Sequence, residues 1–200
     1  MVSKREMTAT SATSVRSDER DQILLKRVAE RDRAAFEELY LNYHRRLARF
    51  LLRFTTRYEV AEEVINDTFW IVWQKAADFR GASRVSTWIM GIAYRRALKS
   101  VNKLRDEPTS EDIETLAATM SDEPLAREEQ RELVLRALNT LSYDQRMAIE
   151  LAYYLGHSCE EIAQIMNCPV GTVKARMFHA RTKLRTVVQS LSGGTAEGLL

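Results

Sequence analysis

The chain has 200 residues, of which 29% are charged, and it contains seven glycines, three prolines and two cysteines, with a formal net charge of +2. This composition favours helices in one or two domains and excludes a disulfide framework. No unbroken apolar run is longer than that from Phe69 to Trp73, which is far shorter than the roughly 20 residues that span a bilayer. No hydrophobic block opens the sequence either, so we expect neither membrane insertion nor a secretory signal.

The first half of the chain predicts a tail followed by a helical domain. Residues 1–20 include a Ser/Thr/Ala-rich stretch and are predicted to form a disordered tail. Residues 21–105 form the predicted domain, with helices over 22–31, after an N-cap at Asp32, over 58–77 and over 85–104. No segment alternates polar and apolar residues for long enough to predict a strand. We therefore predict an all-α protein.

The predicted helix over 58–77 has two different faces. One is apolar, through Ala61, Ile65, Thr68, Phe69, Val72 and Ala76. The other is acidic and aromatic, through Glu63, Asn66, Asp67, Trp70, Trp73 and Gln74. Acids beside an exposed tryptophan are typical of protein–protein contacts, because aromatic anchors supply much of the binding energy. The periodicity equally allows both tryptophans to pack internally while the acids are solvated.

The segment that follows is strongly basic. From Lys75 to Arg105 there are eight cations and one acid, Asp78, interleaved with Phe79, Trp88 and Tyr94. Such surfaces are typical of single-stranded nucleic-acid binding, in which bases stack on rings and phosphates follow the charge. The alternative is a solvated basic helix whose aromatic residues belong to the core, and for Trp88 taken alone this alternative is favoured.

A flexible acidic linker is predicted over residues 106–127. Between 106 and 132 there are ten acids (Asp106, Glu107, Glu111, Asp112, Glu114, Asp122, Glu123, Glu128, Glu129, Glu132) against two cations (Arg127, Arg131), and Pro108 and Pro124 interrupt the segment. Residues 128–191 form the second predicted helical domain. Residues 192–200, which begin at Ser192-Gly193-Gly194, are predicted to be a disordered tail.

The second domain contains a helix-turn-helix pattern. Ser158 and Glu161 form a capping box, and Asn167-Cys168-Pro169 separates this helix from the next. The second helix has one narrow apolar stripe of Val173, Met177, Ala180 and Leu184. Its other face is basic and free of acids, which is typical of a helix that enters the major groove of DNA. A basic surface helix packed on a bundle is the simpler alternative.

No residues are predicted to bind a metal or perform catalysis. His157, Cys159, Cys168 and His179 match no common zinc spacing, and small cysteines of this kind usually belong to a core. The chain also lacks a phosphate-binding glycine loop, a paired-carboxylate site and a nucleophile–base motif. We therefore expect no cofactor, no metal and no enzymatic activity.

Three segments together resemble one family. They are AEEVINDTFWIVW (61–73), FRGASRVSTWIMGIAYRRA (79–97) and LSYDQRMAIELAYYLGHSCEEIAQIMNCPVGTVKARMFHARTKLR (141–185). In order, they resemble regions 2.2, 2.3–2.4 and 4 of bacterial RNA polymerase sigma factors of the extracytoplasmic-function (ECF) type. The resemblance covers roughly residues 21–188. It implies two small helical domains, region 2 and region 4, joined by the acidic linker.

The resemblance also implies partners and contact residues. Core RNA polymerase, through the clamp helices of its largest subunit and the flap of its second-largest subunit, is the implied protein partner. The residues implied to bind the core are Glu63, Asn66, Asp67, Trp70 and Gln74. Those implied to bind the single-stranded −10 element are Phe79, Arg80, Ser83, Arg84, Thr87, Trp88, Arg95 and Lys99. Those implied to bind the duplex −35 element are Thr172, Lys174, Ala175, Arg176, Phe178, His179 and Arg181.

Regulation and location follow from the same resemblance. It implies a cytoplasmic, nucleoid-associated protein and a separate anti-sigma factor that can hold it at the inner membrane. The competing hypothesis is a helix-turn-helix regulator that binds duplex DNA unaided, as a dimer. That hypothesis gives no role to the face containing Trp70.

Overall fold

The computed structural model describes residues 4–53, 55, 57–106, 134 and 136–193. The regular elements of these residues are helices, and their contacts divide the chain into two compact units, Met1–Glu111 and Asp112–Leu200. The prediction of an all-α fold with two small helical domains is thereby confirmed. The predicted linker, residues 106–127, lies outside the described residues apart from Asp106, which ends a helix.

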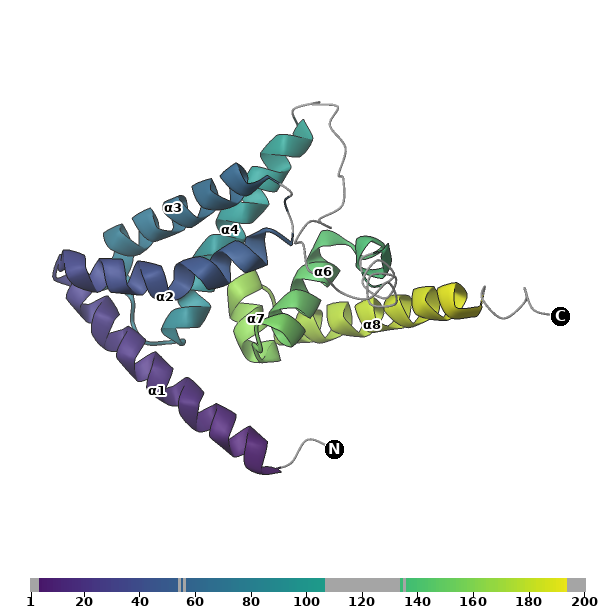
Figure 1. Ribbon diagram of the computed structural model, residues 1–200, viewed down its shortest axis with the longest axis horizontal. Helices are drawn as coiled ribbons and strands as arrows, with labels where there is room; N and C mark the ends of the chain where they lie inside the picture. The colour runs from purple at the N-terminus through teal and green to yellow at the C-terminus, as the bar shows by residue number, and fades with distance from the viewer. Residues whose placement is uncertain (1–3, 54, 56, 107–133, 135, 194–200) are drawn as a thin grey trace, which may run out of the picture. The chain divides into compact units, whose positions relative to one another are not determined.

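Among its described residues, the first unit contains four long helices and one short one. They are α1 (Lys4–Ala29), α2 (Arg33–Leu51), α3 (Tyr58–Lys75), the 3₁₀ turn η1 (Ala76–Asp78) and α4 (Val85–Asp106). Helices α2, α3 and α4 pack together, while α1 folds back on α2 and its N-terminal half extends away from them (Figure 1). The predicted starts of the helices at residues 33, 58 and 85 match the structure.

Helix α1 corrects the prediction for the N-terminus. It begins at Lys4, inside the segment 1–20 for which the sequence predicts a disordered tail. Part of that segment makes tertiary contacts, because Arg20 forms an ion pair with Glu38 of α2. The composition of the segment gave no sign of these contacts, since they involve residues that are distant along the chain.

The core of the first unit follows the predicted apolar faces. Asp32 caps α2 as predicted, its Oδ1 accepting the amide protons of Ala34 at 2.9 Å and Ala35 at 3.1 Å. In α2, the apolar side chains at helical spacing are buried at Leu39, Tyr43, Leu47, Phe50 and Leu51, and half-buried at Phe36 and Tyr40. The predicted apolar face is buried along the whole length of α3 and into η1, at Ala61, Ile65, Thr68, Phe69, Val72 and Ala76.

The second unit contains the predicted helix-turn-helix. Residues 136–139 are helical, and α6 (Tyr143–Ile149) continues as one turn of π-helix, η2 (Glu150–Tyr154). Helix α7 (Cys159–Met166) and helix α8 (Val170–Gly193) follow. The predicted capping box is present, since the Ser158 side chain accepts the amide proton of Glu161 at 3.2 Å and Glu161 accepts that of Ser158 at 2.9 Å. Helix α8 includes residues 192 and 193, the first two of the predicted C-terminal tail.

The stripe of α8 packs as predicted. Val173, Met177 and Ala180 are buried, and Leu184 packs on a cluster that includes Leu138, Leu141 and Ile149. The opposite face of α8 is therefore left for other contacts. None of the helices in the described part of the chain combines the length and hydropathy that a bilayer crossing requires.

Candidate functional site

The two tryptophans of α3 differ in their surroundings. Trp70 is 59% exposed. Trp73 is half-buried: its ring centre lies 5.1 Å from that of Phe36, and the Arg31 guanidinium lies over it at 5.3 Å. Arg31 also donates a hydrogen bond to the Trp73 carbonyl at 2.8 Å. Of the two interpretations of this face, internal packing holds for Trp73 and exposure holds for Trp70.

A shallow groove of about 510 Å³ borders Trp70 between α2 and α3. Asn66 lies on its wall, where its side-chain oxygen accepts a hydrogen bond from the Tyr40 hydroxyl at 3.4 Å. The α2 side of the groove was not predicted from the sequence, because only tertiary packing brings the two helices together. Its lining residues are Arg33, Phe36, Tyr40, Asn66, Phe69, Trp70 and Trp73.

The other predicted residues of the α3 face are accessible to different extents. Glu63 and Gln74 are exposed, whereas Asp67 is half-buried and forms an ion pair with Arg96 of α4 at 3.6 Å. Asp67 thus connects the acidic face of α3 to the basic helix beside it.

A second pocket, of about 430 Å³, lies between α3 and α4. It brings together three of the predicted DNA-binding residues, Trp88, Arg95 and Lys99, and partial burial lowers the pKa of Arg95 below its ordinary value. Two further cations of the basic segment, Lys75 and Arg96, were not among the predicted contact residues and also line it, with Ile71 and Ile92. A half-buried indole therefore lies among four cations.

The loop before α4 adjoins this pocket. The Phe79 ring centre lies 5.4 Å from that of Trp88, and Gly81 adopts a positive φ of 69° that a side chain would strain. Arg80 and Arg84 are exposed and Ser83 is half-buried. Thr87 differs from its predicted role as a surface contact, since its exposed fraction is 2%.

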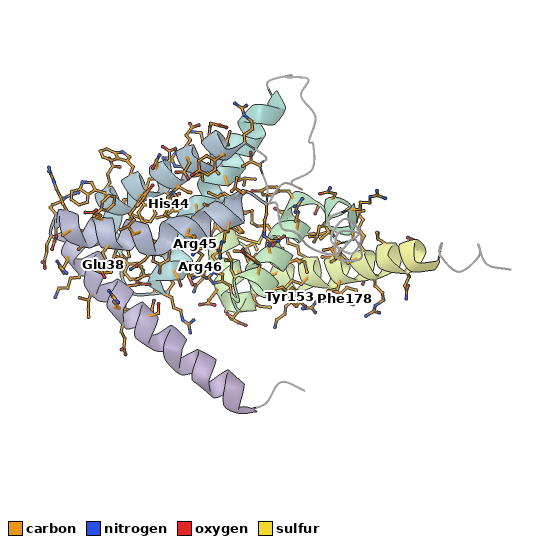
Figure 2. All side chains as sticks on the ribbon, in the orientation of Figure 1. Glu38, His44, Arg45, Arg46, Tyr153 and Phe178 are labelled. Carbon is orange, nitrogen blue, oxygen red and sulfur yellow. The ribbon has the colours of Figure 1, made fainter. Side chains whose placement is uncertain are left out.

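The face of α8 opposite its buried stripe is open. Lys174, Ala175, Phe178 and His179 are exposed, Phe178 by 65% (Figure 2), and Thr172 is half-buried. The rings of Phe178 and His179 meet edge to face, with their centres 5.5 Å apart. The exposed ring of Phe178 on a basic helix is available to a ligand.

Two arginines of α8 are held by the rest of the unit. Arg176 donates hydrogen bonds to the Asp144 carboxylate and, at 3.4 Å, to the Cys168 sulfur. The Arg181 guanidinium lies 5.6 Å from the centre of the Tyr153 ring. Both arginines were predicted contact residues, but their partners were not. Asp144 lies in α6 and Tyr153 in η2, and helix α7 separates both from α8 along the chain.

Comparison with known proteins identifies the family. The model of Sigma-70 region 2 matches residues 39–107, and that of Sigma-70 region 4 matches residues 131–184. The ECF RNA polymerase sigma-E factor of Escherichia coli strain K12 is 33% identical over 183 residues, covering 86% of this chain and 95% of the relative. The chain belongs to the ECF sigma factors. A second sigma-E factor, from Haemophilus influenzae, is 33% identical over 184 residues, covering 86% of this chain and 96% of its own.

Solved structures agree with this assignment. The sigma factor RpoE of Bartonella quintana, in complex with the anti-sigma factor NepR, has a TM-score of 0.59 at 28% identity, covering 77% of this chain and 96% of its own. CnrH, solved with the cytosolic domain of CnrY, shares the fold, with a TM-score of 0.62 at 24% identity over 86% of this chain and 98% of its own. This ECF sigma factor is therefore an alternative sigma factor that directs promoter-specific transcription, and the hypothesis of a stand-alone regulator is disfavoured.

Proposed function

We propose that three surfaces of this sigma factor divide the work of initiation. The first is the exposed face of α3, comprising Glu63, Asn66, Asp67, Trp70 and Gln74, which binds the clamp helices of core RNA polymerase. An exposed indole beside a groove supports this role, because aromatic anchors in pockets supply much of the energy of protein interfaces. The surrounding acids and amides complement a basic partner surface.

The second surface is the α3–α4 pocket with the loop Phe79–Arg84, which receives the unpaired −10 strand. One observation carries this assignment: Trp88 lies among Lys75, Arg95, Arg96 and Lys99. A base can stack on the indole, a contact worth about 1–3 kcal/mol per base, while the cations neutralise the adjoining phosphates. That energy offsets part of the cost of separating the strands. Of the residues predicted for this site, Thr87 supports it from the core.

The third surface is the open face of α8, which reads the −35 duplex. Lys174 donates to base or phosphate oxygens, and the apolar Ala175 and Phe178 suit a thymine methyl group. Thr172, Arg176, His179 and Arg181 complete the predicted contact set. Because Tyr153 supports Arg181 at one edge of the helix, that cation is placed before DNA arrives.

We further propose that this ECF sigma factor is controlled by a separate anti-sigma factor. Two structurally similar proteins were solved with such partners or with a partner's cytosolic domain. The predicted acidic linker, residues 106–127, joins the DNA-binding domains without itself adhering to DNA. Under this proposal the sigma factor is cytoplasmic and performs no catalysis of its own. It is held at the inner membrane when its inhibitor is membrane-bound.

Run-off transcription tests the proposal. Purified bacterial core polymerase is assayed on a promoter library with and without this chain, and initiation at specific sites that depends on the chain supports the proposal. Tight binding to an operator by the chain alone, with no effect on initiation, would instead establish a stand-alone regulator.

A further inference from the structure

The residue before helix α4 is an arginine. The Trp88 amide donates a hydrogen bond to the Arg84 carbonyl at 3.0 Å. Because this is the first hydrogen bond of α4, Arg84 occupies the N-cap position. Helices usually place Ser, Thr, Asp or Asn there, because their side-chain oxygens accept amide protons that have no partner within the helix. An arginine side chain has no acceptor. The neighbouring Ser83 hydroxyl donates to the Arg84 carbonyl at 3.2 Å instead.

A side-chain acceptor for the first turn of α4 comes from α1. Asp18 Oδ1 accepts the amide proton of Val85, the first residue of α4, at 2.9 Å across a separation of 67 residues. Its second oxygen, Oδ2, accepts a hydrogen bond from Gln22 Nε2 at 2.8 Å. Both carboxylate oxygens are thus engaged, and the negative charge lies where the dipole of α4 favours it.

Neighbouring residues of α1 fix the position of Asp18. The Tyr43 hydroxyl of α2 donates a hydrogen bond to Asp21, which is buried with an exposed fraction of 7%. Arg20 forms an ion pair with Glu38, also on α2. The carboxylate that caps α4 is therefore carried by a helix that is itself held against α2.

We propose that Asp18 is a positioning residue for the −10 site: by capping α4 from α1, it fixes the turn from Val85 to Trp88. That turn lies directly between the loop Phe79–Arg84 and the pocket, and it carries the indole on which a base would stack. The proposal rests on the proposed function of this pocket. It adds a role for a residue that makes no contact with the pocket itself.

Three variants of the full-length chain test this role. Asp18→Ala removes the acceptor, and Asp18→Asn keeps a side-chain oxygen for the Val85 amide. Asp32→Ala is the matched control, because it removes an aspartate N-cap from α2 instead. Each variant is assembled with core polymerase, and its affinity is measured for a single-stranded oligonucleotide carrying the non-template −10 sequence of a promoter that the wild-type holoenzyme transcribes. Core affinity is measured in parallel.

We expect Asp18→Ala to weaken oligonucleotide binding about fivefold, the size expected for the loss of one N-cap. Asp18→Asn should restore most of the affinity, and Asp32→Ala should leave it within about twofold of wild type. Core affinity should be the same for all variants. Equal affinities for Asp18→Ala and Asp32→Ala would overturn the proposal, as would an Asp18→Asn variant as weak as Asp18→Ala.

A second measurement separates this role from the function of the pocket. Amide hydrogen exchange of Val85 and Trp88 in the free protein should accelerate about fivefold in Asp18→Ala and stay unchanged in Asp32→Ala, whatever the pocket binds. Unchanged exchange in Asp18→Ala would refute the cap. A Trp88→Ala variant that binds the oligonucleotide as tightly as wild type would refute the pocket's function while leaving the exchange result to stand for the cap.

Discussion

The guanidinium of Arg181 lies over the ring of Tyr153, with 5.6 Å between its carbon atom and the ring centre. Tyr153 belongs to the π-helical turn η2 and is 64% exposed (Figure 2). The contact holds a cation of α8 at the edge of its open face. A cation placed in this way loses less conformational freedom when it meets a phosphate.

Replacing Tyr153 should therefore weaken binding to the −35 duplex. An exposed cation–π contact is worth about 0.5–1 kcal/mol, so Tyr153→Leu should cost about two- to fivefold in affinity at fixed salt. Tyr153→Phe keeps the ring and should bind as wild type. Fluorescence anisotropy of a labelled duplex measures both, and equal losses in the two variants would assign the effect to the hydroxyl instead.

Replacement by alanine should affect polymerase binding at Trp70 and folding stability at Trp73. Trp70→Ala should change the free energy of unfolding by less than about 0.5 kcal/mol, because the ring is exposed. It should weaken core polymerase binding by about 2 kcal/mol or more if the ring is an interface anchor. Trp73→Ala should destabilise the first unit by about 2 kcal/mol, because its ring packs on Phe36.

Urea denaturation and binding to immobilised core polymerase measure these two quantities. The double variant Asp67→Ala, Trp70→Ala extends the test to the ion pair with Arg96. If its affinity for core polymerase equals that of wild type, the α3 face is not the polymerase interface.

Lys174→Ala distinguishes base reading from phosphate contact. Lys174 is exposed on the open face of α8. If Lys174 reads a base, its loss should weaken binding to the −35 duplex by about 1–3 kcal/mol and should weaken binding to scrambled DNA much less. A uniform loss on both duplexes, with a salt slope reduced by about one, would assign it to a phosphate.

Asp21 and Asp32 should give the first unit opposite pH dependences. Burial raises the pKa of Asp21 above its ordinary value of 3.8. The contribution of Asp21 to the stability of the fold is therefore present below pH 3.8 and is lost as the pH rises through the raised pKa. Hydrogen bonds from the Ala35 amide and from Arg27 lower the pKa of Asp32, so its contribution is present above 3.8 and lost as pH falls through the lowered pKa.

Variants isolate these contributions. Relative to wild type, Asp21→Asn should gain stability as pH rises, whereas Asp32→Asn should gain it as pH falls. Urea denaturation between about pH 3 and pH 7 measures both differences. A difference for Asp21→Asn that does not change with pH would show that this carboxyl titrates alike in the folded and unfolded chain.

The sequence predicted features that are local in the chain. Asp32 precedes the amides that it caps by two and three residues, and Ser158 and Glu161 are three apart, so both caps could be recognised from spacing. The apolar stripe of α8 was equally recognisable, because helical periodicity alone determines it. The family resemblance, carried by three segments in order, was confirmed by comparison.

Features that depend on tertiary contacts were not predicted. Spacing placed Trp70 and Trp73 on one face, but only packing against Phe36 and Arg31 distinguishes them. The family resemblance implied that Thr87 contacts the −10 strand, yet this residue is buried. Asp18 was predicted to lie in a disordered tail. The amide that it caps lies 67 residues away, so no local pattern in the sequence indicates this contact.

The cap provided by Asp18 also bears on where the first domain can be cut. A gene fragment starting at residue 21, where the composition changes, would omit the carboxylate that accepts the Val85 amide and the arginine that pairs with Glu38. Such a truncated protein would keep most of the buried core while leaving the start of α4 frayed. Recombinant versions of this domain should therefore begin upstream of Ser17.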